Sequence, residues 1–106
     1  MTLKEIQELL ETSGYPVAYL SFPAENAPSM PFITWQETGS NNISADGHVY
    51  KPVRRIQVDL FTRSKDPVAE AALEGALTDF FWDKTQTLYD TEDCQRYTYE
   101  IEVFGG

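Results

Sequence analysis

The sequence has few of the residues on which most catalytic and metal sites are built. It contains one cysteine, Cys94, and one histidine, His48. A single cysteine cannot form a disulfide within the chain and excludes metal sites built on cysteine pairs. A thiolate of Cys94 activated by His48 is the one nucleophile and base pair left, and it would have to form between two loops. The surrounding DCQRY matches no nucleophile motif, so an idle thiol and a solvent-facing histidine are favoured.

Long apolar runs are absent as well. No window approaches the ~18 continuous apolar residues of a membrane-spanning helix, and we therefore expect no membrane association. The N-terminal stretch MTLKEIQELLE contains acids where a signal peptide would have an apolar run. We therefore expect no secretion signal and a cytoplasmic origin.

Positive charge is scarce. The chain has 17 acidic and 8 basic residues, for a formal net charge of −9. A protein this acidic is not built to bind DNA or an anionic membrane, because phosphate contacts need Lys and Arg facing the ligand. A cluster between positions 51 and 65 could form a local basic patch, although a solvated strand face and turn explain it more simply. Its members are Lys51, Arg54, Arg55, Arg63 and Lys65.

What the sequence does have is ample material for one folded core. Hydrophobic residues make up 42% of the chain and aromatic residues 13%. At 106 residues the chain is long enough for one hydrophobic core and too short for two. We expect a single domain over residues 1–106.

Two segments have the signals of helices. Thr2 and Glu5 stand at capping-box spacing before an amphipathic stretch that ends near Gly14. Asp66 and Pro67 are typical of the cap and the first position of a second helix. The apolar stripe of this second helix runs to about Trp82 and contains Ala69, Leu73, Ala76, Leu77 and Phe80.

Four segments alternate with the period of two that is typical of strands: 15–22, 32–38, 49–62 and 96–104. Pro52 places the start of the third at an edge or a bulge. The segment 39–48 is either a long hairpin loop or contains an irregular strand through Ile43, with a turn signal at Asp46-Gly47. The segment 86–97 is a turn, with a short strand as the alternative. The element order α-β-β-β-α-β indicates an α+β fold, with helices on an antiparallel sheet.

The acidic clusters do not indicate a site. Neither has the alternating ligands and central glycine of a calcium loop, and no phosphate-binding loop is present. We interpret both clusters as solvated turn and helix faces, and predict no catalytic, metal or cofactor site. The clusters are Asp90, Glu92 and Asp93, and Glu70, Glu74 and Asp79.

The aromatic residues are predicted to pack in the core. Stacking platforms for nucleic acid come with basic surroundings, whereas most neighbours of these residues are acidic or apolar. The residues in question are Trp35, Phe80, Phe81, Trp82, Tyr97 and Tyr99.

Several stretches resemble the small tail-terminator and minor tail proteins of siphophages and of prophages in Gram-positive bacteria. They are LKEIQELLETSGYPVAYLSFP, PFITW, IQVDLFTRSKDPVAEAALEGAL and YTYEIEVF. The most specific is VDLFTRSKDPVAEAALE, in which an alternating strand ends at an aromatic-Thr pair and leads through Lys-Asp-Pro into a helix. The likeness covers nearly the whole chain and is weakest between residues 38 and 50.

The resemblance implies a protein that works by assembly. Tail terminators form a ring, usually of six subunits, on the last ring of the tail tube, where they stop tube growth and present a surface to the head connector. The partners implied are other copies of the chain, the major tail tube protein and the neck protein. The genome passes through the ring without being specifically bound. No catalytic residue or cofactor belongs to this family, and its place is the head–tail junction of the virion.

The residues that we expect at subunit or partner interfaces belong to the basic segment and to the polar loop before it. The loop from Gly39 to Tyr50 is either a floppy hairpin or a segment that orders on contact with the tube or connector. A head-side neck or connector protein is the first alternative function, and a small acidic enzyme or regulatory binding module is the second. The interface candidates are Lys51, Arg54, Arg55, Arg63, Lys65, Asn41, Asn42, Asp46 and His48.

Overall fold

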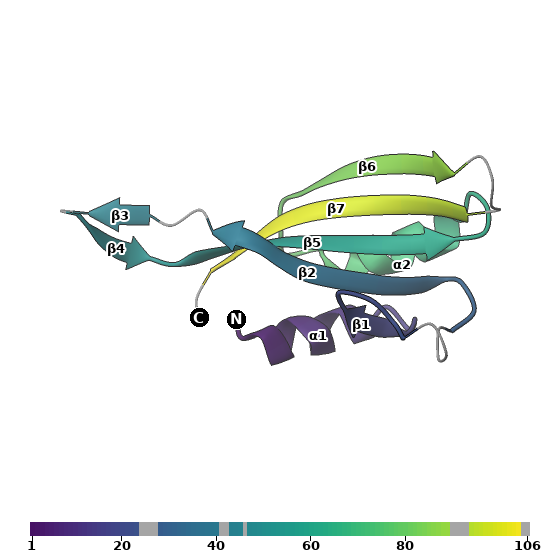
Figure 1. Ribbon diagram of the computed structural model, residues 1–106, viewed down its shortest axis with the longest axis horizontal. Helices are drawn as coiled ribbons and strands as arrows, with labels where there is room; N and C mark the ends of the chain where they lie inside the picture. Colours follow the sequence, from purple (N-terminus) through teal and green to yellow (C-terminus); the bar gives the residue numbers. More distant parts are fainter. Residues whose placement is uncertain (24–27, 41–42, 46, 90–93, 105–106) are drawn as a thin grey trace.

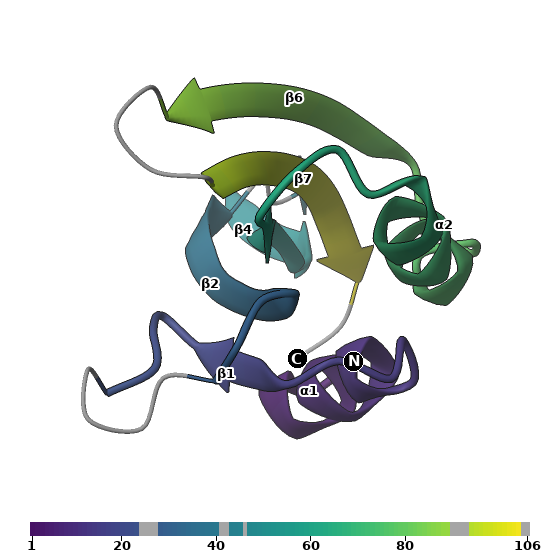
Figure 2. The ribbon, with the colours of Figure 1, turned by 90° about the vertical axis from the view of Figure 1, so that its right-hand side faces the viewer.

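The computed structural model describes residues 1–23, 28–40, 43–45, 47–89 and 94–104. Two helices lie on one face of a five-stranded sheet, and a two-stranded hairpin extends beyond one end of that sheet (Figures 1 and 2). The predicted α+β class is confirmed. The elements are α1 (Leu3–Glu11), β1 (Val17–Tyr19), β2 (Phe32–Ser40), β3 (Ile43–Ala45), β4 (His48–Lys51), β5 (Val53–Thr62), α2 (Pro67–Ala76), β6 (Trp82–Tyr89) and β7 (Cys94–Phe104).

The five-stranded sheet has the order β1-β2-β5-β7-β6. Its pairings are antiparallel except that the short β1 runs parallel to β2. β5 and β7 lie in the middle and pair along their whole common length, from Val53–Phe104 to Thr62–Gln95. β6 therefore forms one edge, while β1 covers only part of β2 at the other.

Both helices begin where the sequence predicts. The Thr2 hydroxyl accepts a hydrogen bond from the Glu5 amide at 3.1 Å, and the Glu5 carboxylate accepts one from the Thr2 amide at 2.9 Å. This is the complete capping box, which satisfies two free N–H groups of the first turn. At α2, the Asp66 carboxylate accepts from the Ala69 amide at 3.0 Å, and Pro67 occupies the first turn.

The prediction that the second helix continues to about Trp82 is wrong. α2 ends at Ala76, and Trp82 begins β6. The Thr78 hydroxyl donates to the Gly75 carbonyl at 2.7 Å, which satisfies a terminal carbonyl and lets the chain turn. Leu77 is nevertheless fully buried, and Phe80 packs against the same core.

For the segment 39–48 the sequence allowed either a long hairpin loop or an irregular strand through Ile43. The structure has a strand there, in agreement with the second alternative. β3 and β4 form a hairpin whose turn includes Gly47 at φ +80. The long strand expected over 49–62 is divided at Pro52, which has no N–H to donate, into β4 and β5. The structure also contains β6. This strand begins at Trp82, before the segment 86–97 in which the sequence allows a short strand.

The core lies between the helices and the sheet, and the predicted strand faces are confirmed. Alternate residues of β5 and β7 point into it, and one face of each helix covers them. Ile6 and Leu10 come from α1, and Leu73 comes from α2. The sheet contributes Ile33, Trp35, Ile56, Val58, Leu60, Tyr97, Tyr99, Ile101 and Val103.

Replacement of Leu73 by alanine should therefore lower the free energy of unfolding by about 2–5 kcal/mol, because it leaves a cavity between α2 and the sheet. Val68→Ala is the matched control on the same helix, since Val68 is 75% exposed. Urea denaturation of the two variants and the parent measures the difference. Equal, small losses for both variants would contradict this packing.

Candidate assembly surfaces

The structure divides the basic segment between the two ends of the sheet. Lys51 lies in β4 and Arg54 and Arg55 lie at the start of β5, whereas Arg63 and Lys65 lie in the turn that follows β5. At about 3.3 Å per residue, the ten residues of β5 separate these groups by roughly 30 Å. The cluster is therefore not one basic patch, in agreement with the favoured interpretation as a strand face and a turn.

The two basic residues that follow one another in β5 also have different surroundings. Arg54 forms an ion pair with Glu37, with Nη1 2.5 Å from Oε2. Arg55 is exposed and lies on the sheet face opposite the helices, where its carbonyl accepts a hydrogen bond from Thr38 at 3.3 Å. Of the predicted interface residues in β5, Arg55 is thus the one available to a partner.

The other predicted interface residues also differ from one another in their surroundings. Arg63 is exposed and forms no ion pair with any described residue. Lys65 pairs with Glu70 at 3.0 Å. His48 lies in β4, while Asn41, Asn42 and Asp46 lie outside the described residues.

The placement of Cys94 and His48 argues against a nucleophile and base pair. Cys94 begins β7, beside the residues that pair with the end of β5, and it is half-buried. His48 lies in the hairpin beyond the start of β5. The length of β5 separates the two residues, so they cannot share a proton.

Asp59 is the centre of the sheet face opposite the helices, and only 5% of its surface is exposed. It accepts hydrogen bonds from the Thr98 hydroxyl at 2.7 Å and the Gln57 amide at 3.0 Å. The Arg96 guanidinium binds both of its carboxylate oxygens, at 3.0 and 3.2 Å. A buried carboxylate needs such partners, and here they leave it neutralised.

The sequence suggested that the acidic residues of α2 form a solvated face. For Glu70 and Glu74 this interpretation is wrong. Glu70 is 5% exposed, and Lys84 from β6 reaches it at 3.0 Å and Glu74 at 2.8 Å. The Tyr99 hydroxyl donates to the same Glu74 at 2.7 Å. The network joins α2 to both β6 and β7. Asp79 follows the helix and is exposed, and Asp90, Glu92 and Asp93 lie outside the described residues.

The network shifts the acidity of its members. Burial raises the pKa of Glu70, but hydrogen bonds from Lys84 and Lys65 outweigh it and hold the pKa below the usual 4.5. The hydrogen bond to Glu74 raises the pKa of Lys84 above 10.5. Burial, and then the hydrogen bond to Glu74, raise the pKa of Tyr99 well above 10.0. Each shift favours the protonation state that holds the network together.

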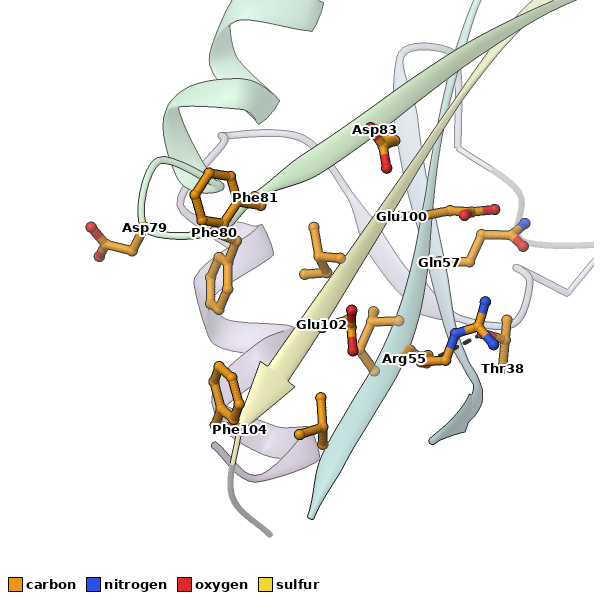
Figure 3. A pocket seen from close by; sticks show the side chains of 13 residues that line it. Thr38, Arg55, Gln57, Asp79, Phe80, Phe81, Asp83, Glu100, Glu102 and Phe104 are labelled. Atoms are coloured by element: carbon orange, nitrogen blue, oxygen red, sulfur yellow. Dashed lines mark hydrogen bonds between the residues drawn. The ribbon is translucent and has the colours of Figure 1, made fainter. Parts of the chain in front are cut away.

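An open groove of about 940 Å³ lies where β5, β7 and the turn between α2 and β6 meet. Figure 3 shows Phe80, Phe81 and Phe104 along one side and Arg55 on the other. Phe81 is fully exposed (101%), and Phe104 is 53% exposed. The other lining residues are Thr38, Val53, Ile56, Gln57, Asp79, Asp83, Glu100, Ile101 and Glu102.

The groove was missed because Phe81 was assigned to the core. That assignment is wrong: Phe80 packs against the core, whereas the side chain of Phe81 is fully exposed. A signal for Phe104 was present in the sequence. The buried residues of β7 alternate up to Val103, so the next position falls on the opposite face.

Among the described residues, no group of three or more His, Cys, Asp or Glu side chains is placed to hold a metal ion. In the same part of the chain, no helix is long and apolar enough to cross a membrane.

Comparison with known proteins identifies a shared fold. No family model and no curated protein matches the sequence. A chain of the solved structure described as "Virion of native gene transfer agent (GTA) particle" superposes with a TM-score of 0.60, covering 97% of this chain and 89% of that one. The two sequences are 13% identical, so the likeness shows the fold and nothing finer.

The network around Tyr99 predicts a loss of stability at high pH. An unfolded chain releases the phenol proton near pH 10.0, whereas the folded protein retains it. The contribution of Tyr99 is therefore intact below that pH and is lost as the pH rises above it. Tyr99→Phe should make the free energy of unfolding, measured in urea from pH 8 to 11, fall less steeply than in the parent. Tyr19→Phe, at an exposed position, is the control; an unchanged slope in Tyr99→Phe would contradict the assignment.

Proposed function

We propose that this chain is a non-enzymatic structural subunit of a phage or prophage virion, and specifically its tail terminator. In this role it forms a ring on the end of the tail tube, stops tube growth and offers the surface to which the head joins. The observation that supports this most is the fold shared with a chain of the gene transfer agent virion, over 97% of this chain. The sequence resemblance to tail terminators points in the same direction.

The placement of the buried charges supports a structural role. Asp59 is neutralised by Arg96, and Glu70 by Lys84 and Lys65. These carboxylates hold strands and helix together, and their oxygens are occupied by internal donors. The features that face outward are instead a groove with exposed aromatic residues and a projecting hairpin, which suit binding to other proteins.

A closed ring needs heterologous contacts, in which one patch meets a different patch on the next subunit. The two ends of this molecule differ in the way that such contacts require. One end has the exposed Arg63, and the other has the hairpin and the acidic groove. The net charge of −9 would give the ring an opening that repels DNA, so that the genome passes without being held.

Deletion of the gene from its parent phage or prophage tests the role in the virion. Electron microscopy should show overlong, irregular tubes beside unjoined heads, because tube growth has lost its stop. Tails of normal length beside separate heads would move the protein to the neck. Intact, infectious particles would contradict a virion role of either kind. A gene position between the connector genes and the major tail tube gene is expected as well.

Reversal of charge at the start of β5 should block ring formation. The double variant Arg54→Glu with Arg55→Glu is expected to remain monomeric in native mass spectrometry under conditions where the parent forms a ring. Arg55→Glu alone should have the same effect while leaving the Arg54–Glu37 ion pair intact. Lys4→Glu is the control, at a side chain that is 86% exposed on α1. Rings of unchanged size from Arg55→Glu would remove this residue from the interface.

A further inference from the structure

Leu20 has a backbone conformation that leucine rarely adopts. Its φ is 69°, and among the described residues it is the one residue other than glycine with a positive φ. The Ser21 amide donates to the Tyr19 carbonyl at 2.9 Å, which closes a three-residue turn with Leu20 at its centre. A positive φ is strained for a residue with a Cβ, whereas glycine adopts it freely.

Contacts on both sides of Leu20 hold this turn in place. The Leu20 amide donates to the Trp35 carbonyl at 2.8 Å. The Tyr19 ring packs edge-on against Trp35, with 4.8 Å between the ring centroids. Phe22 packs edge-on against Phe32, with 5.4 Å between the centroids. These neighbours fix the backbone of the turn.

The Leu20 side chain itself contributes little to the fold, because it is 60% exposed. Glycine would give the same turn without strain, so the fold alone does not account for a leucine at this position. Strained residues that the surroundings hold in place are found at binding sites, where the strain is the cost of presenting a side chain. The turn presents an apolar side chain to the outside of the molecule.

Leu20 belongs to an uncharged edge of the sheet, residues 16–23, which we call the neutral edge. It consists of the edge strand β1 and the turn after it, beside α1 (Figure 2). Its exposed residues include Tyr19, which is 44% exposed, and the prolines Pro16 and Pro23. Aromatic and apolar side chains without charge are typical of the centre of a protein–protein interface.

The distribution of charge favours a second copy of the chain as the partner. With a net charge of −9, two copies repel one another over most of their surfaces. Glu25, which lies outside the described residues, is the one charged residue between Glu11 and Glu37 in the sequence. Glu37 is itself paired with Arg54. The neutral edge is therefore a surface by which copies can approach with little repulsion.

We propose that the neutral edge is a contact surface between copies of this chain, with Leu20 as its anchor. The inference rests on the proposed function, since a ring requires contacts between copies, and it names the residues that form one side of such a contact. Burial of the Leu20 side chain in the assembly offsets the strain of its turn. The subunit thus keeps a strained residue that only the assembled state uses.

Replacement of Leu20 by glycine separates assembly from folding. The urea midpoint of Leu20→Gly should be no lower than that of the parent, because glycine relieves the strain. The oligomer seen by native mass spectrometry should be lost, because the anchor is missing. Leu20→Asn should behave in the same way, since asparagine also tolerates a positive φ. Leu20→Met, which keeps an apolar side chain, should keep the oligomer, as should Val68→Ala at a position that is 75% exposed on α2.

An added charge tests the neutral edge independently of the turn's backbone. Ser21 is exposed within the neutral edge, and Thr87 is exposed on β6 at the opposite edge of the sheet. Ser21→Glu should raise the apparent dissociation constant of the oligomer at least tenfold. Thr87→Glu adds the same charge elsewhere and should leave that constant within about twofold of the parent value.

Four outcomes would overturn the proposal. They are a Leu20→Gly oligomer of normal size, a urea midpoint of Leu20→Gly well below that of the parent, equal effects of Ser21→Glu and Thr87→Glu, and a parent that stays monomeric at every concentration. In the last case, loss of tube capping by Leu20→Gly would assign the neutral edge to the tail tube or connector. Loss of the oligomer in Leu20→Gly, together with intact particles after gene deletion, would contradict the proposed function and leave the contact standing.

Discussion

The pairing of β5 with β7 is the interaction on which the rest of the structure depends. The two strands pair from Val53–Phe104 to Thr62–Gln95, and their inward residues form the floor on which both helices pack. β2 and β6 are held on its two sides. The hairpin extends from one end of β5, and the groove lies beside the same end. Loss of this pairing would remove the core and both candidate surfaces together.

The elements that could be predicted are those whose signals are local. The inward faces of β5 and β7 follow from simple alternation, and the caps at Thr2 and Asp66 each need only a few neighbouring residues. β6 was not fully predicted because edge strands bury little, and its central residues, 83–87, are polar on both faces. The end of α2 was missed for a related reason. Leu77 and Phe80 do pack on the core, but from a turn that continues the apolar pattern without continuing the helix.

The surfaces were harder to predict than the fold, because they depend on residues that are distant in sequence. Arg54 and Arg55 are neighbours in the chain, yet one pairs with Glu37 and the other faces the groove. In the sequence, Glu70 looks like a solvated helix residue. Its ion pair with Lys84 depends on another element, β6, which the sequence pattern does not place beside the helix. The groove combines β5, β7 and the turn after α2. One cysteine and one histidine leave few residues for catalytic or metal chemistry, and on this ground the sequence favours a function carried by surfaces.

A cryo-EM reconstruction of the head–tail junction of the parent particle would test the central claim, that the chain is a ring-forming subunit of the virion, most directly. We expect a single ring of this fold at the head-proximal end of the tail tube, with the helices and sheet recognisable in each copy. A junction of other proteins, with no density that fits this chain, would contradict it.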